Sequence, residues 1–311
     1  MKQKIATIFG ASGFIGRHLI RRLTKKNYRI IAVTRSPYLH GYLKPLGNIG
    51  QIDLEKVNIF NEEKLSPIIE GSDLVINLVG ILFEKKYQKF EDIHSNFPYL
   101  LAKLCKKFNI EKLIHISALG IDENHKSAYM NSKKLGEKYI LDNFENSFIL
   151  RPSIIFGPED NFFNQFASLA NFLPFLPLIG GGKNKFQPIY VVDVVKSITS
   201  LLNNNISKNK IYELCGPEIF SFEELMQILL KQIKKKRLLL PIPFKIAKYN
   251  AKFLQLFPRP LLTEDQVLML KQDNIETGKY LTIKDLNIKP SKLEDILPSY
   301  IYRFRKNGQF A

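Results

Sequence analysis

The first half of the chain alternates short apolar runs with longer amphipathic segments. The apolar runs predict buried strands over 4–9, 29–34, 53–57, 74–79, 112–117 and 148–150. Helical patterns lie between them over 14–25, 62–70, 97–108 and 129–144. Strands that are apolar throughout and alternate with helices are typical of a parallel sheet covered on both faces. We therefore expect an α/β fold with a doubly wound parallel Rossmann sheet and right-handed crossovers.

This alternation fails after Arg151, where proline, glycine and phenylalanine cluster. Residues 187–195 predict one further strand and helix start that return to the sheet, and short elements follow from Ile211. We expect a dinucleotide-binding Rossmann domain over 1–150, to which 187–205 returns. Residues 151–186 and 206–311 would form a smaller C-terminal α/β cap domain on the substrate side.

A glycine-rich turn lies where the first predicted strand meets the first helix. Its sequence is Gly10-Ala11-Ser12-Gly13-Phe14-Ile15-Gly16. The first glycine allows a sharp turn, the second lets the backbone approach a pyrophosphate, and the third lets the helix pack closely on the strand. The N–H groups at the start of that helix favour phosphate. We expect the dinucleotide to bind at Gly10, Ser12, Gly13, Phe14, Ile15 and Gly16.

The residues after the second predicted strand indicate which dinucleotide is bound. An acidic residue there would accept a hydrogen bond from the ribose 2′-hydroxyl of NAD. This chain instead has Thr34-Arg35-Ser36, and its next acidic residue is Asp53. A guanidinium at Arg35, helped by Arg17 and Ser36, suits a 2′-phosphate. We therefore expect NADPH in preference to NADH, the alternative being that Arg35 is simply solvated.

A serine, a tyrosine and a lysine form the candidate catalytic set. Ser117 ends the fifth predicted strand, and Tyr129 and Lys133 lie four residues apart on the following helical segment. That spacing places both side chains on one helix face. A nearby ammonium lowers the pKa of a phenol, so Tyr129 would exchange a proton with a carbonyl or alcohol while Ser117 orients the reacting oxygen. Lys133 would also hold the ribose. The alternative is an ordinary helix surface.

The histidines and cysteines give no sign of a metal site. His94 and His115 have no acidic partner at a useful spacing, so we expect them to pack rather than to bind a ligand. Cys105 and Cys215 are far apart and belong to no Cys-x-x-Cys pair. This usage suits a reducing cytosol and argues against a disulfide framework or zinc. We expect both cysteines to be small buried residues.

Basic residues are concentrated in one stretch of the chain. The chain has 46 Lys+Arg against 29 Asp+Glu, a net charge of +17, and residues 225–263 contain nine basic residues and no acidic one. Within this stretch Lys245, Lys248 and Lys252 alternate with Tyr249 and Phe253. Cations among aromatic and aliphatic residues suit a surface that lies on anionic lipid or on a partner. A solvated cap face is the alternative, and nucleic acid is disfavoured because no recognition module accompanies the charge.

Hydropathy and the position of the first strand set the expected location. No apolar run in the chain reaches the roughly 18 residues that a membrane-spanning helix needs. Strand-like residues begin at Lys4, so we expect no cleaved leader. We expect a cytoplasmic protein, with residues 231–262 as its candidate contact with the inner face of the cytoplasmic membrane or with a respiratory complex.

Together these residues resemble the extended and atypical branch of the short-chain dehydrogenase/reductase superfamily. Supporting segments are Ser95-Asn96-Phe97, Leu150-Arg151-Pro152, Phe156-Gly157-Pro158, Tyr190-Val191-Val192-Asp193 and Cys215-Gly216-Pro217-Glu218. A more specific similarity, through 43–51, 75–80, 90–92, 156–164 and 187–194, is to the nucleotide-binding accessory subunits of respiratory complex I. The resemblance covers nearly the whole chain.

The resemblance implies a tightly held NADPH, without established turnover, in a protein that supports a quinone-reducing membrane complex. It implies that Asn58 and Gly80 line the adenine and ribose side of the cofactor. It also implies that Pro152, Ile154 and Ile155 flank the nicotinamide. The intact set of Ser117, Tyr129 and Lys133 keeps a second hypothesis open, an active NADPH-dependent reductase or epimerase.

Overall fold

A parallel sheet of eight strands forms the centre of the molecule. The computed structural model describes residues 3–121, 126–202, 209–258, 260–306 and 308. The strands are β1 (Ile5–Phe9), β2 (Arg29–Val33), β3 (Ile52–Glu55), β4 (Leu74–Asn77), β5 (Lys112–Ile116), β6 (Ser147–Pro152), β11 (Lys210–Leu214) and β14 (Leu281–Thr282). Their order is β14-β11-β6-β5-β4-β1-β2-β3. The strand order reverses between β1 and β4, and ligands bind at such a reversal in doubly wound sheets.

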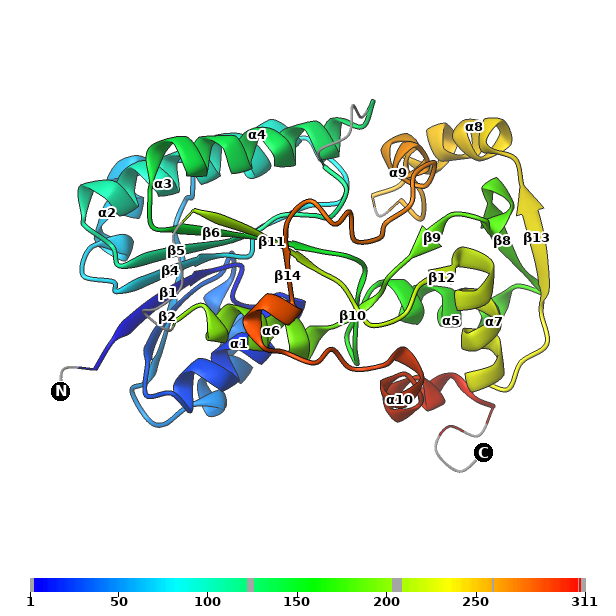
Figure 1. The fold of residues 1–311 in the computed structure, drawn as a ribbon, viewed down its shortest axis with the longest axis horizontal. Coiled ribbons are helices and arrows are strands. Elements are labelled where there is room, and N and C mark those ends of the chain that lie inside the picture. The colour runs from blue at the N-terminus through cyan, green and yellow to red at the C-terminus, as the bar shows by residue number, and fades with distance from the viewer. Residues whose placement is uncertain (1–2, 122–125, 203–208, 259, 307, 309–311) are drawn as a thin grey trace.

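Helices cover both faces of this sheet (Figure 1). On one face lie α1 (Phe14–Thr24) and α6 (Val191–Ser200), whose apolar side chains pack into one core cluster with β1. On the other lie α2 (Glu62–Ile69), α3 (Phe97–Lys107) and α4 (Ala128–Asn143). Phe97 and Leu101 of α3 pack there against Phe9 of β1 in a second cluster. The expected fold class, a doubly wound parallel α/β sheet, is confirmed.

A smaller body of short elements lies beyond the carboxyl ends of the strands (Figure 1). Its helices are α5 (Phe162–Phe172), α7 (Phe222–Gln232), α8 (Phe244–Leu254), α9 (Glu264–Met269), α10 (Leu293–Ile296) and α11 (Pro298–Ile301). Its strands pair as β7 (Ile155–Phe156) with β10 (Ile189–Tyr190), β8 (Phe175–Ile179) with β13 (Leu238–Ile242), and β9 (Lys185–Phe186) with β12 (Phe220–Ser221). A phenylalanine-rich cluster that includes Phe163, Phe186 and Phe222 forms its core.

The described residues also form five further helical segments. They are η1 (Pro37–Leu46), η2 (Asp92–Asn96), η3 (Gly180–Gly182), η4 (Lys284–Leu286) and η5 (Tyr302–Phe304). The turn η2 is π-helical and runs directly into α3. The two cysteines are buried and free, as expected.

The expected division of the chain needs correction at two places. Within 187–205, the described residues 187–202 supply no strand to the large sheet: β10 pairs with β7, and it is α6 that packs on the sheet. Residues 206–311, which the sequence predicts to lie in the cap, contribute β11 and β14 to the Rossmann sheet beside β6. The apolar-run pattern misses β11 because it contains the buried Glu213, whose carboxylate accepts hydrogen bonds from the Thr277 backbone N–H and hydroxyl at 2.7 and 2.8 Å. The strand β14 has only two residues.

A buried ion pair ties α4 to the sheet. Arg151 of β6 donates from Nε and a terminal nitrogen to the Glu137 carboxylate of α4, at distances down to 2.6 Å. Both side chains are at most 4% exposed. The Tyr280 ring covers the guanidinium at 4.4 Å. Removing one partner of a buried pair leaves a charge without compensation, which costs far more than the pair contributes.

We therefore predict that Glu137→Ala lowers the free energy of unfolding by about 3–5 kcal/mol. Urea unfolding followed by circular dichroism measures this. The control is Glu111→Ala, which removes an exposed partner 2.6 Å from Lys4 and is expected to cost less than about 1 kcal/mol. Equal losses for the two variants would contradict the structural role given to the buried pair.

Candidate functional site

The glycine turn lies at the reversal of strand order, between β1 and α1. Gly10 has φ +79°, and its carbonyl accepts a hydrogen bond from the Gly13 N–H at 3.0 Å. A Cβ added to Gly10 would lie 3.1 Å from the Leu78 backbone, just beyond β4. One added to Gly16 would lie 2.3 Å from the Ala11 carbonyl oxygen. The turn is therefore closed by backbone contacts that only glycine permits.

The start of α1 is suited to an anion. Gly13 is the N-cap residue, no side chain caps the helix there, and its first turn contains no acidic residue. The first N–H groups of a helix have no partner within the helix, and the helix dipole places partial positive charge beside them. Phe14 begins the helix and contacts Gly157, where an added Cβ would lie 3.1 Å from the phenyl ring. This geometry fits the pyrophosphate of a dinucleotide.

The residues expected at the adenosine end lie beyond β2 and β3. The carbonyl of Val33, the last residue of β2, accepts a hydrogen bond from Ala11 at 3.4 Å, so the end of β2 adjoins the glycine turn. Arg35 follows it and is exposed, as is Asn58 after β3. Asp53 is bound by Arg29 at 2.8 Å. The carboxylate of Asp53 is therefore already engaged in an ion pair.

Arg17 lies on the first turn of α1. Its guanidinium is 3.6 Å from the Glu159 carboxylate and 5.8 Å from the centre of the Tyr42 ring. The Tyr42 hydroxyl donates to the Ser12 carbonyl oxygen at 3.3 Å. The Arg17 Nε is buried and has no hydrogen-bond partner in the described structure. A donor of this kind beside a phosphate site suits an anionic ligand.

The candidate catalytic residues lie on β5 and α4. Ser117 follows β5, where its N–H donates to the Leu150 carbonyl at 2.7 Å. The Ser117 hydroxyl is buried and unpartnered within the described residues. Lys133 is 3% exposed, and its Nζ donates to the Ile116 carbonyl at 3.1 Å. A Cβ added to Gly80 would lie 3.4 Å from that Nζ, so Gly80 adjoins Lys133. Ser117, Lys133 and Gly80 therefore border one region at the ends of β4 and β5.

The electrostatics differ from the expected activation of Tyr129. Burial, together with the negative charge of Asp265, raises the pKa of Tyr129 to about 12. Burial lowers the pKa of Lys133 to about 8, against the opposing effect of Glu137. From the helical spacing we predict that the Lys133 ammonium lowers the pKa of Tyr129. That prediction is wrong, because the pKa is raised. Burial decides the direction, because both side chains are buried, and the Lys133 ammonium is bound to the main chain.

His94 has a role that the sequence does not reveal. Its Nε2 accepts from the Ile81 N–H at 3.0 Å, and its Nδ1 lies 3.0 Å from the Ser132 hydroxyl. That hydroxyl donates to the Tyr129 carbonyl at 2.7 Å, so Nδ1 must be the donor to it. Burial first, then the charge of Lys133, lowers the pKa of His94 to about 2. A neutral imidazole therefore joins the loop after β4 to α4.

The residues expected around the nicotinamide lie on β6 and β7. Pro152 ends β6, Ile155 begins β7, and Ile154 between them accepts a hydrogen bond from Ile189 at 2.9 Å. The order of the strands places Asn58 and Arg35 toward the β3 edge and Pro152 beyond β5 on the other side of β1. The expected residues therefore form a line along the carboxyl ends of the strands, with the glycine turn in its middle.

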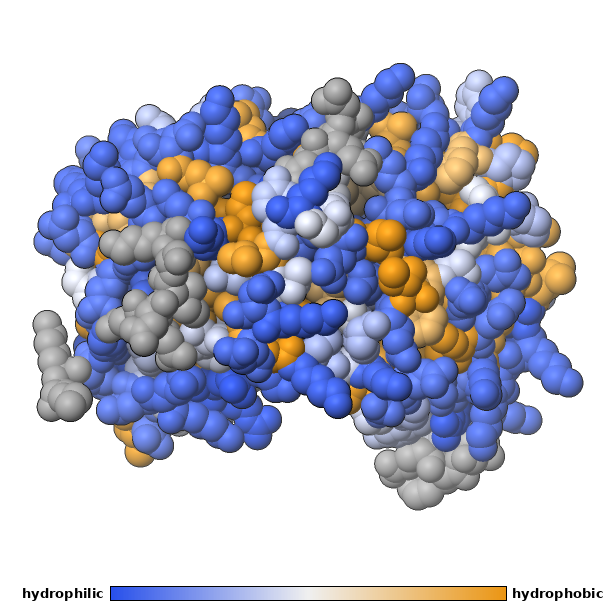
Figure 2. Space-filling model, viewed as in Figure 1, coloured by the Kyte–Doolittle hydropathy of each residue, from blue (hydrophilic) through white to orange (hydrophobic). Residues whose placement is uncertain are grey.

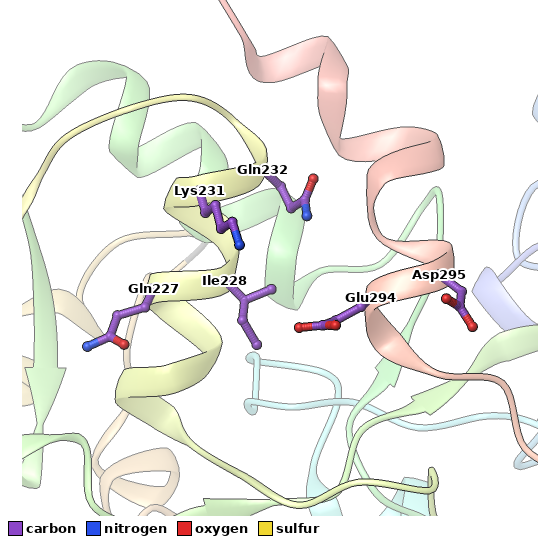
Figure 3. Close-up of a pocket in the computed structure, with 6 residues that line it drawn as sticks. All are labelled: Gln227, Ile228, Lys231, Gln232, Glu294 and Asp295. Atoms are coloured by element: carbon purple, nitrogen blue, oxygen red, sulfur yellow. The ribbon is translucent and has the colours of Figure 1, made fainter.

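A groove elsewhere in the molecule has different chemistry. It has a volume of about 500 Å³ and is lined by Gln227, Ile228, Lys231, Gln232, Glu294 and Asp295. Figure 3 shows the side chains of α7 facing those of α10 across it. None of the expected site residues lines this groove. Its lining mixes both charges and carries no residue of the dinucleotide site.

Comparisons with known proteins agree with this geometry. Residues 6–215 match the model of the NAD dependent epimerase/dehydratase family. The chain is 32% identical to "NADH dehydrogenase (ubiquinone) 1 alpha subcomplex subunit 9, mitochondrial" of Arabidopsis thaliana, over 98% of this chain and 79% of that protein. A protein of the same name from Dictyostelium discoideum is also 32% identical, over 98% and 86%.

Solved structures share the fold at lower identity. A dTDP-glucose 4,6-dehydratase from Streptomyces venezuelae superposes with a TM-score of 0.75 at 16% identity, covering 98% of both chains. A UDP-glucose 4-epimerase from Thermotoga maritima gives 0.72 at 18% identity, covering 97% and 99%. Among the described residues, no helix is both long and apolar enough to cross a membrane. The chain is an NAD(P)-binding, short-chain-dehydrogenase-like protein that belongs to the NAD dependent epimerase/dehydratase family, and within it to the group that includes the complex I alpha subcomplex subunit 9 proteins.

Proposed function

We propose that this chain holds an NAD(P)(H) cofactor, with NADPH preferred, as a component of a respiratory or quinone-related system at a membrane. The observation that carries the proposal is the burial of Tyr129, which keeps its hydroxyl protonated. Its ring packs edge-on against His94 at 5.1 Å and Phe90 at 5.7 Å, and its pKa is raised to about 12. A general acid or base works best with a pKa near the working pH. The site therefore suits binding better than proton transfer.

The relatives support the same proposal. Curated proteins that match nearly the whole chain carry the name of an NADH dehydrogenase (ubiquinone) subunit. The glycine turn and the start of α1 would hold the pyrophosphate, and Lys133 would hold the ribose beside Gly80. The cofactor, when bound, supplies a hydride donor or acceptor. Tyr129, with its proton retained, would present a hydroxyl rather than a phenolate.

An active NADPH-dependent reductase or epimerase is the second candidate. The buried Ser117 hydroxyl, with no partner among the described residues, favours it, because a buried polar group is normally satisfied. A substrate oxygen would supply the missing hydrogen bond. Ser117 would then orient that oxygen, and Tyr129 would donate its proton.

We predict that the purified protein retains a dinucleotide and that Gly13→Val loses it. The backbone of Gly13 has φ −74°, which valine can adopt, but the added Cβ would lie 3.1 Å from the Gly10 carbonyl oxygen, so the turn must shift slightly to accept it. Its side chain would occupy the space that the pyrophosphate needs. Native mass spectrometry identifies the bound nucleotide, and circular dichroism checks that the variant is folded. A nucleotide that remains bound to the folded variant would contradict the site.

The same nucleotide-bound protein can be used to test whether the cofactor is only held or is also turned over. Carbonyl and quinone compounds are added, and oxidation of the bound NADPH is followed by its fluorescence. The holding role predicts no oxidation. Oxidation that disappears in Tyr129→Phe, which removes only the hydroxyl, would instead establish the reductase.

We predict that Arg35→Ala weakens NADPH by about 1.5–3 kcal/mol, the contribution of a charged hydrogen bond, and leaves NADH nearly unchanged. Calorimetric titration with both nucleotides measures this. Arg29→Ala is the matched control, because Arg29 is an exposed arginine at the start of β2, the strand that precedes Arg35. Equal weakening of both nucleotides would show that Arg35 does not bind the 2′-phosphate.

The outer face of α8 favours a contact with an anionic membrane surface. Only Ala247 and Ala251 of this helix are fully buried. Ile246, Tyr249 and Phe253 are 52%, 75% and 64% exposed and follow one another at helical spacing. Lys245, Lys248 and Lys252 form a parallel exposed row beside them. Figure 2 shows hydrophobic and hydrophilic side chains interleaved at the end of the molecule where α8 and β13 lie.

We predict salt-sensitive binding to vesicles containing phosphatidylserine, which Lys245→Glu, Lys248→Glu and Lys252→Glu together remove. Each cation near such a surface contributes about 1 kcal/mol, decaying over about 8 Å at physiological salt. The matched control reverses Lys103, Lys106 and Lys107, three exposed lysines of α3. Co-sedimentation measures binding. If both triple variants sediment like the unmodified protein, or if the unmodified protein does not sediment at low salt, α8 is only a solvated face.

A further inference from the structure

We propose that Asp265, from the C-terminal cap domain, is a positioning residue of the dinucleotide site. Its carboxylate accepts hydrogen bonds from the N-terminus of α4 and so fixes the turn that carries Tyr129. This inference rests on the proposed nucleotide site and adds a residue to it. Asp265 lies on α9, 136 residues along the chain from Tyr129. Figure 1 shows α9 beside the end of α4 that begins at Ala128.

Three donors converge on this carboxylate. The Ser127 hydroxyl donates to it at 2.7 Å, the Ala128 N–H at 2.7 Å and the Tyr129 N–H at 3.3 Å. The Ser127 hydroxyl accepts from the Met130 N–H at 3.1 Å. The first three N–H groups of α4 therefore all have partners, and two of these depend on Asp265. A helix usually obtains such caps from its own preceding residues, so this one is a contact between two parts of the chain.

The helix that supplies Asp265 is itself anchored. Its first turn has a capping box, in which Thr263 and Gln266 exchange hydrogen bonds of 3.2 and 3.0 Å. Val267 is buried in a cluster with Ala247 and Ala251 of α8. The position of Asp265 is therefore fixed by the capped first turn of α9 and by the packing of this helix on α8.

The contact between Asp265 and α4 affects the candidate site through Tyr129 and Lys133. Tyr129 lies in the first turn of α4, and Lys133 lies one turn further along the same face. The Tyr129 carbonyl accepts from Ser132, which also contacts His94. Asp265 thus stabilises the end of the helix from which the nicotinamide side of the site is built. In the described part of the chain, the hydrogen bonds of Asp265 go to residues 127–129 and none goes to the glycine turn or β2.

The test compares the full-length protein with Asp265→Ala and Asp265→Asn. Hydrogen exchange at the amides of residues 128–130 is expected to accelerate about fivefold or more in the alanine variant, which loses both acceptors. The asparagine variant keeps one oxygen acceptor, so its exchange rates are expected to lie between those of the unmodified protein and the alanine variant. Asp285→Ala is the matched control, because Asp285 accepts at 2.7 Å from the nearby Thr282 N–H, within its own turn.

Nucleotide titrations separate positioning from a general loss of stability. NADPH is expected to bind Asp265→Ala about fivefold or more weakly, while adenosine 2′,5′-bisphosphate, which lacks the nicotinamide half, binds equally to both proteins. Unchanged exchange at residues 128–130 would overturn the proposal, as would equal weakening of the two ligands. Failure of the unmodified protein to bind either ligand would overturn the nucleotide site instead, and the exchange measurement would still decide the cap.

Discussion

The packing of α4 against the π-helical turn η2 is the contact on which the rest of the site depends. A Cβ added to Gly136 would lie 1.8 Å from the His94 carbonyl oxygen, so α4 approaches more closely than any side chain would allow. At this distance the polar face of the helix is buried rather than solvated. Tyr129, Lys133 and Glu137 follow one another at four-residue intervals on that face. The two charged groups on that face then need hydrogen-bond partners. Lys133 donates to the Ile116 carbonyl, and Glu137 accepts from the Arg151 guanidinium.

Burial also sets which groups carry charge. It lowers the pKa of His94 to about 2 and raises that of Tyr129 to about 12, so both are neutral near pH 7. Lys133, with a pKa of about 8, remains mainly charged there. An unfolded histidine takes up a proton below about pH 6.5, whereas His94 in the folded chain does not. Its contribution to stability is therefore present above that pH and is lost as the pH falls toward the folded-state pKa. Near pH 7 the site therefore combines a neutral imidazole and a neutral phenol with a mainly protonated Lys133.

The sequence predicts the parts of the fold that depend on local pattern. The six strands of the first half are predicted from their apolar runs, and the structure has all of them with ends shifted by one or two residues. The glycine turn is predictable because the close contacts of Gly13 and Gly16 are with the backbone of the turn itself, at Gly10 and Ala11. By contrast, β11 is concealed by Glu213, whose partner Thr277 is 64 residues away. His94 and Asp265 could not be identified for the same reason, because their roles rest on hydrogen bonds between distant segments. The spacing of Tyr129 and Lys133 places them on one face but carries no information about desolvation, which decides the direction of the pKa.

The hairpin of α8 and α9 connects two features that the sequence leaves separate. One side of α8 presents the exposed row of Ile246, Tyr249 and Phe253, and its other side packs on α9 through Ala247 and Ala251. The first turn of α9 supplies Asp265, whose carboxylate accepts from the first turn of α4. Val267, two residues after Asp265, is buried in the same cluster as Ala247 and Ala251, and packed side chains have few alternative arrangements. The exposed row of α8 and the start of α4 are therefore joined through one packed pair of helices.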